Sequence, residues 1–187
     1  MTPHQRLSDW SGSVQAHRLP RYDELPGIDL YMDQVVAVVS DYLHPYMRDA
    51  KEQHLTPAMI NNYVKLKLLP APVKKRYNRS HLCHLIIICM LKPVLAIPEI
   101  HDLICDRLQY SDIRTVYNEF CTMQEESLRT TLAHTTLPAD DETEAFSVAA
   151  LHLAVHANAG KMIAERIIDA QVPDEPKEKD KKKKDKD

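Results

Sequence analysis

Residues 56–91, TPAMINNYVKLKLLPAPVKKRYNRSHLCHLIIICML, decide the fold. The opening Thr-Pro can cap a helix and begin its first turn, so we expect a helix from Thr56 to about Leu69. The Pro-Ala-Pro that follows stops this helix, because proline breaks helical geometry. A second helix from Ser80 to Lys92 is apolar on nearly every side, which is typical of a helix at the centre of a core.

Further stretches on both sides of this segment have helical spacing of their apolar residues. These expected helices cover residues 28–43, 98–108, 111–133 and 142–170. The chain has 187 residues with only 3 Gly, 12 Pro and 6% aromatics, which argues against a β-sandwich and against a glycine-rich phosphate-binding enzyme. We therefore predict an all-α protein with a small wing.

Six cations and no carboxylate lie within residues 65–79, although the formal net charge of the chain is −3. The cations are Lys65, Lys67, Lys74, Lys75, Arg76 and Arg79. The helix before them presents Asn61, Asn62 and Lys65 opposite its apolar face. Asparagine can make two hydrogen bonds to an adenine edge in the major groove, and lysine can reach guanine or phosphate. We expect these three residues to read bases and the later cations to bind phosphates.

The order of elements supports this interpretation. The expected elements have the order of a winged helix-turn-helix. They are a helix, a connection, an amphipathic helix with a polar outer face, a basic proline-bounded loop and a core helix. A run of charge is, however, usually a solvated face. The alternative is a helical protein-protein interaction module, in which the same basic patch binds an acidic partner and never touches DNA.

Several motifs carry a resemblance to known families. YDELPGIDLYMDQVV, LTPAMINNYVK and PVKKRYNRSHLCHLIIICMLKPVLAIPEI resemble a bacterial family catalogued as domain of unknown function 1836. Within them, MINNYVKLKLLPAP, KRYNRSHL and LKPVLAIPEI are similar to the DNA-binding domain of MerR-type regulators. The resemblance implies a winged helix-turn-helix that binds DNA as a homodimer. It matches Asn61, Asn62 and Lys65 to the recognition helix, and Lys74, Lys75, Arg76 and Tyr77 to the wing.

From these patterns we predict a sequence-specific transcriptional regulator, in particular a repressor, that binds double-stranded DNA as a homodimer. Base reading is assigned to Asn61, Asn62 and Lys65, and phosphate binding to Lys67, Lys74, Lys75, Arg76, Tyr77 and Arg79. The expected organisation is a flexible leader (1–21), the DNA-binding domain (22–108), a helical dimerisation or regulatory region (109–171) and a disordered Lys-rich tail (172–187). The broad apolar faces of residues 146–167 favour a second protomer as their cover. An effector is not identifiable.

Other functions lack their signatures. The four cysteines form no C-x-x-C pair, and the chain shows no export signal and no apolar run of the roughly 20 residues that span a membrane. We expect a cytoplasmic protein with reduced thiols. The pair His152 and His156 lacks the glutamate of a zinc hydrolase motif, and H-x-C-H at residues 81–84 is expected to be a core feature. No nucleophile elbow or P-loop is present. We predict no enzymatic activity, no cofactor and no metal.

Overall fold

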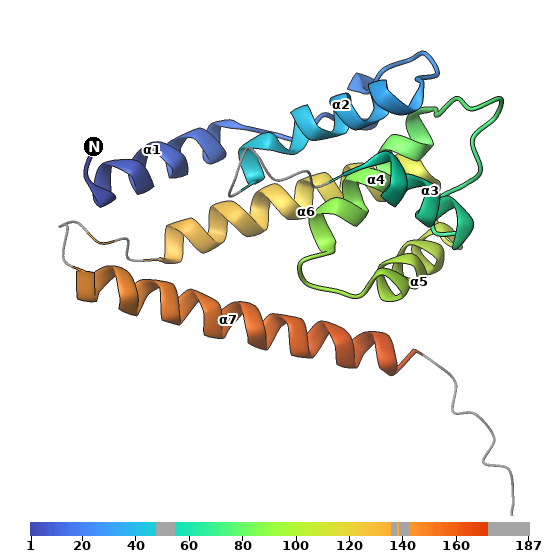
Figure 1. Ribbon diagram of the computed structural model, residues 1–187. Coiled ribbons are helices and arrows are strands. Elements are labelled where there is room, and N and C mark those ends of the chain that lie inside the picture. Colours follow the sequence, from blue (N-terminus) through green and yellow to red (C-terminus); the bar gives the residue numbers. More distant parts are fainter. Residues whose placement is uncertain (48–54, 136–137, 139–142, 172–187) are drawn as a thin grey trace, which may run out of the picture.

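The computed structural model describes residues 1–47, 55–135, 138 and 143–171, and within them the chain is helical (Figure 1). Two short 3-10 helices, Tyr22–Glu24 and His44–Tyr46, connect longer elements. The α-helices are α1 (Pro3–Ala16), α2 (Met32–Leu43), α3 (Pro57–Lys65), α4 (Arg79–Leu91), α5 (Ile97–Leu108), α6 (Ile113–His134) and α7 (Thr143–Asp169). The expected all-α class is confirmed.

Helix α4 forms the centre of the core. Its residues 81–89 are all buried, which follows from its apolar residues on every side. It packs against α2 and α6, from which Val35, Val39, Tyr117 and Cys121 are fully buried. One continuous apolar cluster therefore joins the expected DNA-binding region to the first half of α6.

The N-terminal segment differs from the expected flexible leader. Residues 3–16 form α1, because Thr2 and Gln5 cap each other in a capping box and a proline occupies the first turn. The segment after α1 is fixed to α6: the guanidinium of Arg21 donates two hydrogen bonds of 2.7 Å to the carboxylate of Glu125. The same carboxylate accepts the backbone N–H of Leu19 at 3.0 Å. Two more α6 side chains hold the same segment: the hydroxyl of Tyr117 donates to the carbonyl of Pro20 at 2.8 Å, and Asn118 accepts the N–H of Tyr22 at 2.9 Å.

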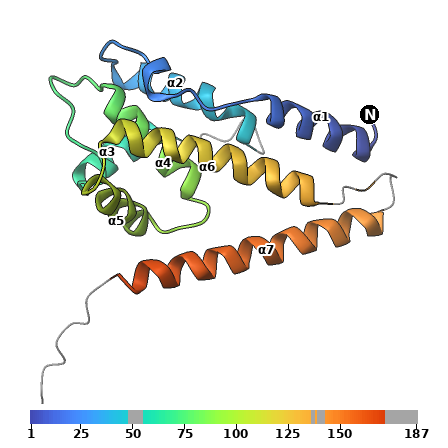
Figure 2. The ribbon, with the colours of Figure 1, turned by 180° about the vertical axis from the view of Figure 1, so that it is seen from behind.

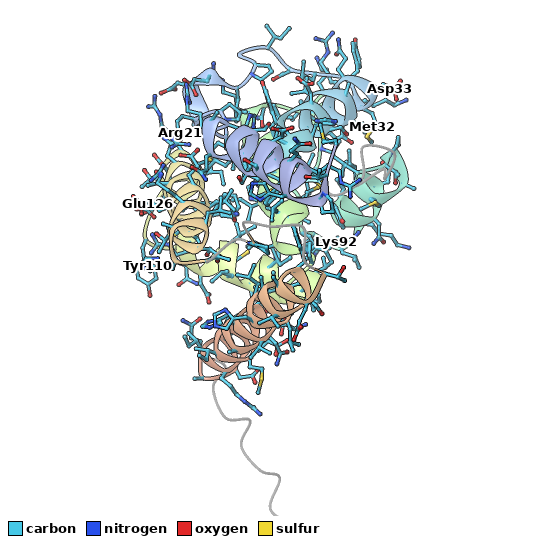
Figure 3. The ribbon with its side chains drawn as sticks, turned by 90° about the vertical axis from the view of Figure 1, so that its left-hand side faces the viewer. Arg21, Met32, Asp33, Lys92, Tyr110 and Glu126 are labelled. Atoms are coloured by element: carbon cyan, nitrogen blue, oxygen red, sulfur yellow. The ribbon has the colours of Figure 1, made fainter. Side chains whose placement is uncertain are left out.

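Helix α7 lies as a separate layer on one side of the remaining helices, as Figures 1 and 3 show. Figure 2 shows the same arrangement from behind. Ala164 and Ile168, near its C-terminal end, pack against the core cluster, yet none of its residues is fully buried. Large apolar side chains elsewhere along α7 are exposed. These are Val148, Leu151, Val155, Met162, Ile163 and Ile167.

Some expectations lie outside the described residues: the connection around residues 48–54, the start of the expected helix at residue 142, and the Lys-rich tail. Within the described part, no helix is both long and apolar enough to cross a lipid bilayer.

Candidate nucleic-acid interface

Helix α3 begins where its sequence predicts. The side chain of Thr56 accepts the backbone N–H of Met59 at 3.2 Å, and a proline follows in the first turn. Ile60 and Tyr63 are buried, whereas Asn61, Asn62 and Lys65 are exposed. The structure therefore brings the three residues assigned to base reading together on the outer face of α3.

Helix α3 ends at Lys65, four residues earlier than expected, in a Schellman motif. The N–H of Leu68 donates to the carbonyl of Tyr63 at 2.9 Å, and the N–H of Lys67 donates to that of Val64 at 3.1 Å. This motif requires the residue after the cap to adopt the left-handed conformation, a position that glycine usually takes. Here Lys67 takes it, with φ of 61°.

A two-residue hairpin follows. Val73 and Arg76 exchange backbone hydrogen bonds of 2.9 and 3.2 Å, so Lys74 and Lys75 form the tip. Their φ values are 50° and 62°. Positive φ at both central residues is the requirement of a type I′ turn, for which Asn-Gly is strongly preferred. The sequence instead places two lysines there, and both are exposed.

The hairpin is attached to the start of α2. Tyr77 and Leu30 exchange backbone hydrogen bonds of 2.8 and 2.9 Å. The guanidinium of Arg76 lies 4.8 Å from the ring centroid of Tyr31 and donates to its hydroxyl at 2.9 Å. These contacts fix the C-terminal strand of the hairpin, and Val73 pairs with Arg76 across the turn, so the two lysines project from a fixed base. Tyr31 is 45 residues from its partner, and no sequence signal pointed to it.

Tyr77 and Arg79 do not suit the role assigned to them. The side chain of Tyr77 is 3% exposed and belongs to the core, so it cannot reach a phosphate. Arg79 donates to the carbonyl oxygens of Leu25 at 3.0 Å and Asp23 at 3.3 Å. We correct both assignments: Tyr77 fixes the hairpin to the core, and Arg79 holds the segment before α2 against α4.

Five exposed cations remain at this end of the molecule, namely Lys65, Lys67, Lys74, Lys75 and Arg76. None of them forms an ion pair with another described residue. In the described part of the chain, the non-glycine residues with positive φ are three of these lysines. A non-glycine residue in this conformation costs on the order of 1 kcal/mol or more, and such strain is concentrated at functional sites. The segment therefore exposes positive charge at the expense of stability.

The cysteines and histidines of α4 belong to the core. Burial raises the pKa of the thiol of Cys89 to about 12 and also raises the pKa of Cys83. The imidazole Nδ1 of His84 lies 2.7 Å from the carbonyl oxygen of Ser80. No cluster of three or more potential metal ligands occurs among the described residues.

The comparisons with known proteins give a family and no function. Neither curated proteins nor solved structures include a significant match to this chain. The resemblance to MerR-type regulators accordingly has no counterpart in them. A family described as a domain of unknown function, DUF1836, matches residues 20–120, which span α2 to α5, the hairpin and the first part of α6. The chain therefore belongs to the DUF1836 family.

Proposed function

We propose that this protein is a homodimeric, sequence-specific DNA-binding transcriptional regulator that acts as a repressor by occupying a two-fold operator. The observation that carries the proposal is the hairpin tip, where Lys74 and Lys75 occupy left-handed positions that favour Asn and Gly. Stability alone would select against these lysines. Phosphate binding by a projecting wing accounts for them.

The parts have complementary roles. The outer face of α3 enters the major groove, where Asn61 and Asn62 hydrogen-bond to base edges and Lys65 reaches guanine or phosphate. Lys67 and the hairpin tip bind the phosphates on either side. The fixed base of the hairpin supports this arrangement, since the contacts of Tyr31 and Leu30 hold the tip in position relative to α2.

The homodimer is supported by α7. This helix of 27 residues buries one edge against the core and leaves an apolar stripe exposed. A second copy of the chain can cover the stripe, and a two-fold dimer matches a two-fold operator. Sedimentation should give a dimer for the wild type and a monomer for Val155→Glu, which places a charge in the middle of the stripe.

The test of base reading is selection from randomised duplexes by the full chain. The wild type should enrich one sequence, and Asn61→Ala and Asn62→Ala should each lose about 1–3 kcal/mol of discrimination at one position. Alanine favours helix, so these exposed substitutions keep α3 intact. The matched control is Asn158→Ala, an exposed asparagine on α7. If both α3 variants select the same sequence as the wild type, α3 does not read bases.

A competition experiment separates this function from the interaction module. The protein is bound to immobilised phosphate groups and challenged with duplex DNA or with polyglutamate at equal charge. Displacement by duplex at lower concentration supports a DNA reader. Displacement by polyglutamate at the lower concentration overturns the proposal in favour of an acidic protein partner.

A further inference from the structure

Two histidines on the exposed side of α7 have converging ring nitrogens. The Nε2 atoms of His152 and His156 are 3.2 Å apart, and both side chains are exposed. In a tetrahedral zinc site with Zn–N bonds of about 2.0–2.1 Å, two ligand nitrogens are roughly 3.3–3.4 Å apart. The distance between the two nitrogens is therefore close to that between two histidine ligands of one zinc ion. Neither residue has a role in the proposed DNA interface.

Two imidazoles alone do not complete such a site, because zinc takes four ligands. In the described part of one chain, no third histidine, cysteine or carboxylate joins the pair. The missing ligands must come from another molecule. The homodimer proposed above supplies one, and the inference rests on that part of the proposed function.

One stripe of α7, centred on Val155 and running from Glu144 to Arg166, is self-complementary when two copies of the helix run antiparallel and cross at Val155. With about 100° of rotation per residue, the stripe stays within roughly 40° of Val155 around the helix. In this register Val148 faces Met162 of the other copy, and Leu151 faces Ala159, so a larger side chain meets a smaller one. The ends of the stripe also match, because Glu144 faces Arg166. The stripe consists of Glu144, Val148, Leu151, Val155, Ala159, Met162 and Arg166.

The same register brings the histidine pairs together. His152 and His156 lie roughly 60° and 100° around the axis from Val155, both on one flank of the stripe. With a rise of about 1.5 Å per residue, the midpoint of each pair is only about 1.5 Å along the axis from the two-fold. The two-fold places the flanks of both copies on the same side of the helix pair. Four imidazoles thus gather around one point.

We propose that His152 and His156 of two copies of this chain form a shared site for one divalent transition metal of the zinc class. Imidazole nitrogen suits zinc, cobalt and nickel, and four such ligands satisfy a tetrahedral ion. Metal and apolar contacts then act on the same surface, so the ion strengthens the association of the two α7 helices. The metal has a structural or regulatory role, because all four ligand positions are protein atoms.

A second histidine pairing offers a matched control. On α5, the Sγ of Cys105 is 3.3 Å from Nε2 of His101, whose Nδ1 is 2.9 Å from the carboxylate of Asp102. Cys105 is exposed and His101 half-buried, and the two are also spaced by four residues, yet they lie outside the α7 stripe. A metal signal that depends on α5 would therefore exclude the α7 site.

The test is titration of the full chain with Co²⁺, whose visible absorption reports a tetrahedral site, together with equilibrium dialysis against Zn²⁺. We expect one metal ion per two chains. His152→Gln and His156→Gln should each weaken binding at least tenfold, whereas His101→Gln with Cys105→Ser should bind as the wild type does. Far-ultraviolet circular dichroism checks that each exposed variant remains helical.

Sedimentation velocity with and without Zn²⁺ distinguishes the two proposals. We expect at least tenfold tighter dimerisation with Zn²⁺, and no such change in His156→Gln. A wild type that dimerises but binds no metal overturns the shared site and leaves the dimer standing. A metal-free monomer that takes up one ion per chain, or remains monomeric with Zn²⁺, overturns both the site and the α7 dimer. DNA binding is measured separately and does not decide either outcome.

Discussion

The hairpin tip makes a prediction in which stability and binding change in opposite directions. The perturbation is the double substitution Lys74→Asn with Lys75→Gly, which supplies the residues preferred in a type I′ turn. Both lysines have positive φ, and relief of that strain is worth on the order of 1 kcal/mol at each position. The greater freedom of glycine in the unfolded chain takes back roughly 0.5–1 kcal/mol. We expect a net stabilisation of about 1 kcal/mol.

A gain of this size raises Tm by roughly 2–4 °C for a chain of this length. Loss of two phosphate contacts should at the same time make the slope of log affinity against log salt shallower by about 1.8 per protomer. The assays are thermal unfolding and fluorescence anisotropy with duplex DNA. The control is Lys92→Gln, since Lys92 is exposed with φ of −51° and lies at the other end of α4. A destabilised double variant, or one with an unchanged salt slope, would refute the reasoning.

Three further predictions concern the scaffold. Glu125→Gln should lower the free energy of unfolding at pH 7 by roughly 2–3 kcal/mol. The guanidinium of Arg21 lowers the pKa of Glu125, so the wild type should lose this advantage only as the pH falls below about 4.5. Urea unfolding from pH 7 to pH 3 measures this, and identical acid profiles of wild type and variant would contradict it. Burial lowers the pKa of His84 below 6.5, so His84 binds a proton more readily in the unfolded chain than in the folded one. As the pH is lowered from 6.5, the free energy of unfolding should therefore decrease more steeply in the wild type than in His84→Gln. Parallel profiles of the two proteins would contradict this. Native chain should react with a thiol reagent first at Cys105, the exposed cysteine among three buried ones; mass mapping that finds Cys121 modified first would exclude the observed packing.

Sequence patterns predicted the helices well where burial or capping decided them. The apolar residues throughout α4 indicated a central position, and the Thr-Pro before α3 indicated its start. The exposure of Asn61, Asn62 and Lys65 also followed from helical periodicity. By contrast α1 was not expected, because its few apolar residues show little periodicity and its order depends on a capping box.

The roles of several site residues depend on contacts between residues far apart in the chain, which the spacing of apolar residues does not predict. Arg79 looked like one more free cation, but it is occupied by carbonyls more than fifty residues earlier in the chain. Tyr77 looked like a wing residue, but backbone pairing with Leu30 turns its side chain into the core. The positive φ values of the three lysines could not be predicted either, because glycine or asparagine is the usual residue at such positions.

The measurement that tests the central claim most directly is a salt series of duplex binding by the wild type and by Lys65→Gln with Lys67→Gln. The duplexes are the region upstream of the protein's own gene and a scrambled version. If Lys65 reaches a phosphate and the other four exposed cations each bind one, the wild-type slope should be about −4.5 per protomer, and the variant slope should be shallower by about 1.8. Lys92→Gln should match the wild type. A wild type that fails to bind either duplex at low salt would contradict the account.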